Sequence, residues 1–239
     1  MAPPLLTQGT IVYNVPIWNK SEQPVDRITD HLETPLLDNR SYRVVRLANQ
    51  LEYLLVHDPE TDKASAALDI NVGNFSNKAD MPGMAHAVEY LLFIGTKKYP
   101  VENVYNQYLS AHLGYSNAYT SATLINYFFE VGVKPSEGKE TSESPLYNAL
   151  DRFAQFFIKP LFLLSTLDRE LQALEKSLSN LKHPYCHFFI GNFKVLKTEP
   201  EARGIDVRAK FIKFYKKYYS VNRIKLYMLG REPLNILER

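Results

Sequence analysis

The chain has 239 residues, of which 45% are hydrophobic and 23% charged, and a formal net charge of +2 at pH 7 with histidine neutral. These values are typical of a globular protein and exclude strong bulk attraction to nucleic acid or to an anionic membrane. No run of about 18 apolar residues would cross a bilayer, and the single cysteine, Cys186, excludes an internal disulfide. Residues 1–18 carry no charged side chain, unlike a secretory or mitochondrial leader. We therefore expect a cytoplasmic protein that binds neither nucleic acid nor membrane.

The first part of the chain predicts an arm followed by a hairpin. Residues 1–38 contain five prolines and little periodicity, which predicts an extended N-terminal arm. Residues 39–239 contain no linker or repeat, so we expect them to form a single domain. The β-rich stretches 42–47 and 51–57, separated by a short turn, predict a β-hairpin. Alternating apolar residues over 64–75 predict a third strand.

Helical and strand patterns follow the third strand. Pro82 suits the first turn of a helix and Gly95 suits a left-handed helix end, so we expect a helix between them. A second helix is expected over residues 101–112. Two paired strands are expected after it, over 115–121 and 125–133.

The second half of the chain predicts three helices and a strand. Ser144 and Pro145 form a helix start, and the apolar residues after them are spaced as on one buried helix face. Leucines recur at helical spacing over 167–181, a last helix is expected over 207–219, and a strand over 224–229. This order of elements predicts an α+β fold with a largely antiparallel mixed sheet covered by helices.

One short motif inside the first predicted helix carries chemistry. His86, Glu89 and Tyr90 are spaced three and four residues apart, so they share one face of the helix. With histidine in place of Tyr90 the motif would be His-x-x-Glu-His, the inverted zinc-peptidase motif. Taken alone, a histidine and a glutamate three residues apart on a helix are more often a pair without chemical purpose.

The surrounding residues make the functional interpretation stronger. The sequence around this motif closely resembles the zinc-site region of the insulin-degrading-enzyme-like (insulinase, or pitrilysin) family of zinc peptidases. The resemblance covers nearly everything from Asp26 onward, and its most specific segments are residues 75–86, 91–100, 106–110, 116–120, 126–131, 167–171 and 183–185. It implies the N-terminal domain of a zinc endopeptidase that encloses peptide substrates in a chamber built from four related domains.

The resemblance also implies roles for individual residues. His86 matches the first zinc ligand, Glu89 matches the general base that activates the zinc-bound water, and Glu170 matches an acidic residue that supports the site. An edge-strand segment that pairs with the substrate backbone is matched by Asn117, Ala118 and Tyr119. The plainer alternative for this segment is an ordinary sheet strand.

The second zinc ligand of the family is missing from this sequence. Tyr90 stands at its position, and tyrosine is not a usual zinc ligand. Deprotonating a phenol with an ordinary pKa of about 10 would cost about 4 kcal/mol at pH 7 without help from a metal. His112 and His183 could replace the lost ligand, but each is more simply an ordinary surface or helix-end histidine.

The third ligand, a glutamate, is also missing. In the family it follows two helical turns after the position of Glu170, where this chain has Ser177. Glu175 lies five residues after Glu170, about 140° away around a helix axis. The simplest explanation is a deletion between Ala173 and Leu174, across which the leucine spacing stays in phase.

Three functional hypotheses remain open. We favour a truncated insulinase-type domain that is catalytically inactive, because the resemblance implies further domains beyond Leu234. The alternative is a non-catalytic module of the same fold that binds peptides, a complementary peptidase domain or a second copy of itself. The third is a working zinc endopeptidase that recruits a replacement ligand from a partner or from Tyr90 as phenolate.

Overall fold

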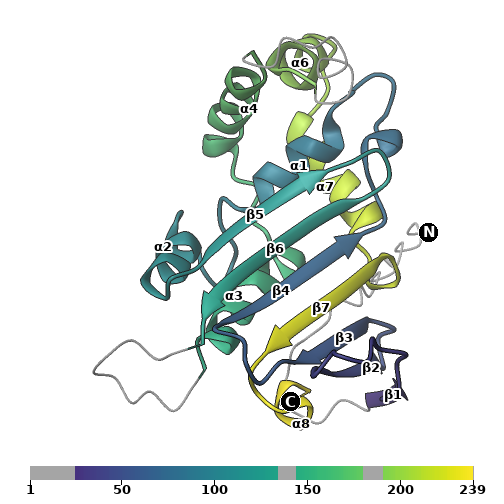
Figure 1. Ribbon diagram of the computed structural model, residues 1–239. Helices are drawn as coiled ribbons and strands as arrows, with labels where there is room; N and C mark the ends of the chain where they lie inside the picture. The colour runs from purple at the N-terminus through teal and green to yellow at the C-terminus, as the bar shows by residue number, and fades with distance from the viewer. Residues whose placement is uncertain (1–24, 134–143, 180–190, 239) are drawn as a thin grey trace, which may run out of the picture.

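The computed structural model describes residues 25–133, 144–179 and 191–238. One mixed sheet of seven strands has the order β1-β2-β3-β7-β4-β6-β5 (Figure 1). Neighbouring strands are antiparallel except for the parallel pair β3 and β7. The strands are β1 (Val25–Thr29), β2 (Ser41–Leu47), β3 (Glu52–His57), β4 (Lys63–Ile70), β5 (Tyr115–Thr120), β6 (Ile125–Gly132) and β7 (Ile224–Gly230). The predicted α+β fold is confirmed.

The helices α1, α3 and α7 cover one face of the sheet, and α2 lies beside β5 (Figure 1). The α-helices are α1 (Met84–Leu92), α2 (Val104–Ala111), α3 (Pro145–Ile158), α4 (Leu164–Ser179), α6 (Glu199–Ala202), α7 (Val207–Tyr218) and α8 (Leu234–Leu237), and shorter helical turns are η1 (Asn74–Ser76), η2 (Lys194–Thr198) and η3 (Val221–Arg223). As predicted, Ser144 caps α3, accepting a hydrogen bond from the backbone N–H of Leu146. No helix in the described ranges is long and apolar enough to cross a membrane.

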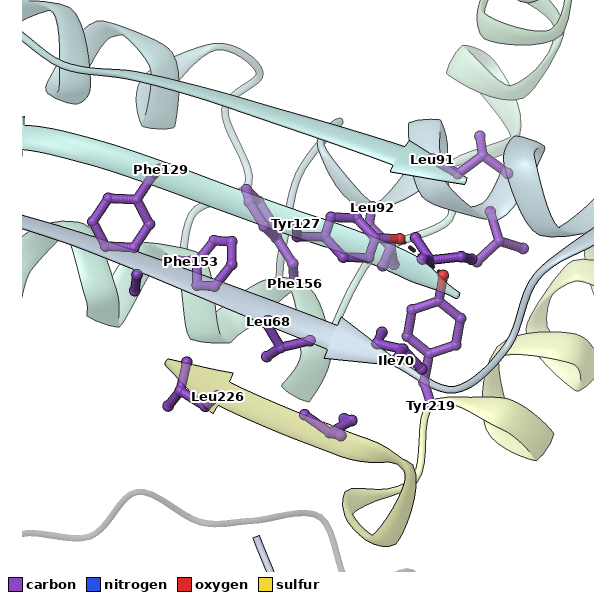
Figure 2. Packing of buried hydrophobic residues seen from close by; sticks show 14 of the residues in the cluster. Leu68, Ile70, Leu91, Leu92, Tyr127, Phe129, Phe153, Phe156, Tyr219 and Leu226 are labelled. Atoms are coloured by element: carbon purple, nitrogen blue, oxygen red, sulfur yellow. Dashed lines mark hydrogen bonds between the residues drawn. The ribbon is translucent and has the colours of Figure 1, made fainter. Parts of the chain in front are cut away.

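An aromatic core lies between the sheet and α3 (Figure 2). Buried and partly exposed residues alternate along β4 and β6, so each strand turns one row of side chains toward the helices. Phe129 of β6 packs edge-to-face on Phe153 of α3, with ring centroids 5.1 Å apart. The hydroxyls of Tyr127 and Tyr219 form a buried hydrogen bond of 2.8 Å, which satisfies both polar groups inside the core.

Strand β1 was not expected from the sequence. It lies inside the segment 1–38, which was predicted to be an extended arm. Its residues are mostly exposed and show no clean alternation of apolar side chains. It is held by pairing with β2 and by the ion pair of Arg27 with Glu238, just after α8. The described part of the segment therefore belongs to the sheet.

Strand β4 is shorter than the predicted strand over residues 64–75. It ends at Ile70, and the following residues bond to the turn between β5 and β6. The N–H groups of Asn74 and Phe75 donate to the carbonyls of Ser121 and Ala122, each at 2.9 Å. This tertiary pairing fixes the connection that leads into α1.

Candidate active site on helix α1 and strand β5

Helix α1 is held firmly and exposes one narrow face. It starts after Gly83, whose φ of 87° is left-handed, and the side chain of Asn77 accepts a hydrogen bond of 2.8 Å from the N–H of Ala85. Every residue of α1 is buried except His86 and Tyr90, which are partly exposed. The two residues therefore form the open face of the helix.

The side chains on this face contact one another and the edge of the sheet. The rings of His86 and Tyr90 meet edge-to-face with centroids 5.0 Å apart. Glu89 is only 4% exposed, and its carboxylate accepts a hydrogen bond from the hydroxyl of Thr120 at the end of β5. The structure thus brings together the predicted helix motif and the strand that contains the predicted peptide-binding segment.

Burial changes the charge of both ionisable groups. Burial lowers the pKa of His86 from 6.5 to about 4, so the imidazole is neutral at pH 7. Burial raises the pKa of Glu89 from 4.5 to about 7, although the hydrogen bond from Thr120 acts in the opposite direction. A carboxyl group with a pKa near neutrality has the protonation behaviour of a general acid or base.

The zinc site implied by the helix motif can be tested against these residues. Nδ1 of His86 is buried without a hydrogen-bond partner, which suits a neutral imidazole ligand. A catalytic zinc needs three protein ligands, and the described part of the chain holds no group of three or more His, Cys, Asp or Glu residues arranged to bind a metal. The residues described here do not fit a zinc centre.

Two of the other candidate residues, the supporting acid Glu170 and the possible replacement ligand His112, lie within the described part of the chain. Glu170 of α4 pairs with its neighbour Arg169 at 2.8 Å. Nδ1 of His112 lies 2.8 Å from the carbonyl oxygen of Tyr108, at the end of α2, as expected for a helix-end histidine. His183 falls outside the described residues, and the side chain of Ser177 is not described.

The predicted peptide-binding segment lies on the edge of the sheet. Strand β5 pairs with β6 on one side and with no described strand on the other. The side chain of Asn117 accepts a hydrogen bond of 2.8 Å from the N–H of Ala118, so this N–H does not donate to β6. Tyr119 is 51% exposed. An unpaired edge with an outward N–H can accept an added strand.

Thr120 is the contact that sequence reasoning missed. It follows directly after the segment Asn117, Ala118 and Tyr119, and it is the residue that joins β5 to Glu89. Strand alternation puts Ala118 and Thr120 on the same face of the sheet. This alternation could have indicated Thr120 from the sequence. The exposed side chains of the strand, Asn117 and Tyr119, lie on the other face.

We expect Glu89→Gln to change how stability depends on pH. Between pH 4.5 and 7 the folded chain keeps a proton on Glu89 that the unfolded chain has lost, so this residue lowers the free energy of unfolding as pH rises. The free energy of unfolding of Glu89→Gln, relative to the natural chain, should therefore rise by about 3 kcal/mol between about pH 4.5 and 7.5. Urea denaturation with a metal chelator present measures this.

Two comparisons sharpen the measurement. His86 acts in the opposite direction, because its folded pKa of about 4 lies below 6.5, so its contribution increases with pH and remains in the Glu89→Gln variant. Thr120→Val removes the hydrogen bond that lowers the pKa of Glu89 and should shift the transition to higher pH. A relative stability of Glu89→Gln that is constant with pH would contradict the buried placement of this carboxyl group.

Comparison with known proteins identifies the family to which this chain belongs. The family described as Insulinase (Peptidase family M16) matches residues 52–189, so the chain belongs to the insulinase family of peptidases. It is 47% identical to the putative zinc protease mug138 of Schizosaccharomyces pombe, in an alignment that covers 90% of this chain and 23% of that protein. It is 43% identical to human insulin-degrading enzyme, in an alignment that covers 92% of this chain and 22% of that enzyme.

The solved structures give the same assignment. The crystal structure of pitrilysin matches with a TM-score of 0.79 and 29% identity, over 90% of this chain and 24% of that chain. The expected family and the expected fold are both confirmed. The chain spans less than a quarter of the length of these curated relatives.

Proposed function

We propose that this chain is a catalytically inactive insulinase-type peptidase domain. The observation that carries the proposal is the position of Tyr90, whose ring lies against His86 on the open face of α1, where the family motif has a second histidine. A neutral phenol does not replace an imidazole as a zinc ligand. His86 then remains a single ligand beside the general base Glu89.

We further propose that the domain binds peptides without hydrolysing them. Support comes from β5, which is an edge strand and carries Asn117, Ala118 and Tyr119 beside α1. Peptide binding by strand addition uses backbone hydrogen bonds and needs no metal. We also propose that the chain is cytoplasmic and that a complementary peptidase domain is its second partner.

Ala118→Pro is expected to weaken peptide binding about tenfold, because it removes one edge hydrogen-bond donor. The N–H of Ala118 bonds to the side chain of Asn117 and not to β6, so proline at this position leaves the pairing of β5 with β6 in place. Fluorescence anisotropy with a labelled unstructured peptide measures the dissociation constant, and Ala118→Ser, which keeps the N–H, is the matched control.

The same preparation tests whether the chain is inactive. No cleavage of an internally quenched peptide is expected, with or without added zinc. Cleavage that zinc supports and Glu89→Gln abolishes would refute the proposal and favour an endopeptidase with a replacement ligand. If Ala118→Pro and Ala118→Ser bound the peptide with equal affinity, the edge of β5 would not be the peptide-binding site.

A further inference from the structure

One face of the sheet carries no helix in the described part of the chain (Figure 1). Helix α3 packs on the opposite face, behind the strands in the view of Figure 1, and the strands turn their fully buried rows toward it. The alternate rows of side chains point away from α3 and stay partly exposed. A sheet face of this kind is stable in water only where its side chains are polar, and it is otherwise covered by another layer.

An apolar row crosses the open face at right angles to the strands. The pairing register aligns one residue from each of β2, β3, β7, β4 and β6 in this row: Val44, Leu54, Tyr227, Ala67 and Phe128. Tyr227 is 38% exposed, and the other four side chains are also partly exposed. A continuous apolar row five strands wide is typical of a surface that binds another segment.

A polar row lies beside it, two residues away on each of the same strands: Arg46, Glu52, Lys225, Asp69 and Asn126. Its side chains bond to one another. Arg46 pairs with Glu52 at 2.6 Å, Lys225 pairs with the same carboxylate, and Asn126 donates a hydrogen bond of 2.6 Å to Asp69. The polar row is therefore suited to water, and only the apolar row gains free energy from being covered.

The N-terminal residues of the chain match the apolar row in charge and in pattern. Residues 1–24 lie outside the described part of the chain, and residues 1–18 carry no charged side chain. Within them four apolar residues recur at every second position: Ile11, Tyr13, Val15 and Ile17. An extended chain carries such residues on one side, and Pro16 favours extended backbone at the residue before it.

The length and the point of attachment of this segment also fit. Strand β1 follows the segment and is the edge strand beside β2, so the segment reaches the apolar row at its β2 end. Five strands span about 19 Å from β2 to β6, and residues 11–17 span about 20 Å when extended. Tyr13 then falls over β4, where the row has its smallest side chain, Ala67. This leaves room for a ring between Tyr227 and Phe128.

We propose that residues 11–17 of this chain lie in extended conformation across the apolar row and form a strap over the open face of the sheet. Apolar side chains of both surfaces leave water at this contact, which stabilises it. The strap crosses the strands at about a right angle, as in orthogonal packing of β layers, and its backbone bonds to water on the outer side. The strap does not depend on peptide binding at β5.

Tryptophan fluorescence of the whole chain tests the strap. The chain has a single tryptophan, Trp18, so Tyr13→Trp combined with Trp18→Phe places the only tryptophan over Ala67. We expect its emission to lie at shorter wavelength, and to be better shielded from acrylamide, than in the same chain unfolded in urea. Tyr227→Lys should abolish both effects, because it buries an unpaired charge under the strap. Tyr119→Lys is the matched control at a 51% exposed tyrosine outside the row, and it should preserve both.

The outcomes decide what covers this face. A tryptophan in the folded chain that acrylamide quenches as fully as in urea, or shielding that Tyr227→Lys leaves unchanged, would overturn the proposal. Shielding that increases with protein concentration, together with dimers in sedimentation, would place a second copy on the face and would overturn it as well. If Tyr227→Lys does not fold, nuclear Overhauser effects between the Ala67 methyl and the ring of Tyr13 are expected in the natural chain. Their absence would contradict the strap.

Discussion

Replacing Phe153 by alanine is expected to lower the free energy of unfolding by about 3–5 kcal/mol. Phe153 is 1% exposed and lies on α3, where its ring packs edge-to-face on Phe129 of the sheet at 5.1 Å and on Phe157 at 5.3 Å. Its removal leaves a cavity between two layers that the surrounding rings cannot fill without leaving their rotamers. Urea denaturation followed by circular dichroism measures the change.

Leu36→Ala is the control for this experiment, because Leu36 is 100% exposed. Its substitution should change the free energy of unfolding by less than about 0.5 kcal/mol. A cost below about 1 kcal/mol for Phe153→Ala would mean that α3 does not pack on the sheet as described, since smaller values are typical of surface positions.

The sequence predicts the core elements of the fold well because their burial is periodic. The hairpin β2–β3 and the strands β5 and β6 lie within two residues of their predicted bounds. Helix α1 is shorter than the interval between Pro82 and Gly95, because local capping signals locate helix ends only approximately. Strand β1 escaped prediction because its stability comes from pairing and from the distant Glu238.

The sequence predicts only the part of the candidate site that lies on one helix. A spacing of three and four residues places His86, Glu89 and Tyr90 on one face. The hydrogen bond from Thr120 to Glu89 joins residues 31 positions apart, and only the tertiary packing of β5 beside α1 creates it.

The proposed loss of two zinc ligands predicts that restoring both raises the zinc content of the chain to one zinc per molecule. The natural chain offers His86, and Tyr90→His adds a second imidazole one helical turn away. Reinserting the glutamate-bearing segment between Ala173 and Leu174 adds the third ligand that a catalytic zinc requires. Losing a residue that only supports a ligand costs roughly 10–100-fold in zinc affinity, so losing two ligands should abolish stoichiometric binding.

The most direct test is the zinc content of the natural chain after dialysis, measured by atomic absorption beside Tyr90→His and the doubly repaired variant. We predict no stoichiometric zinc in the natural chain, weak retention in Tyr90→His and one zinc per chain in the doubly repaired variant. One tightly bound zinc in the natural chain would contradict the account and would mean that His86 shares the metal with ligands outside the described residues.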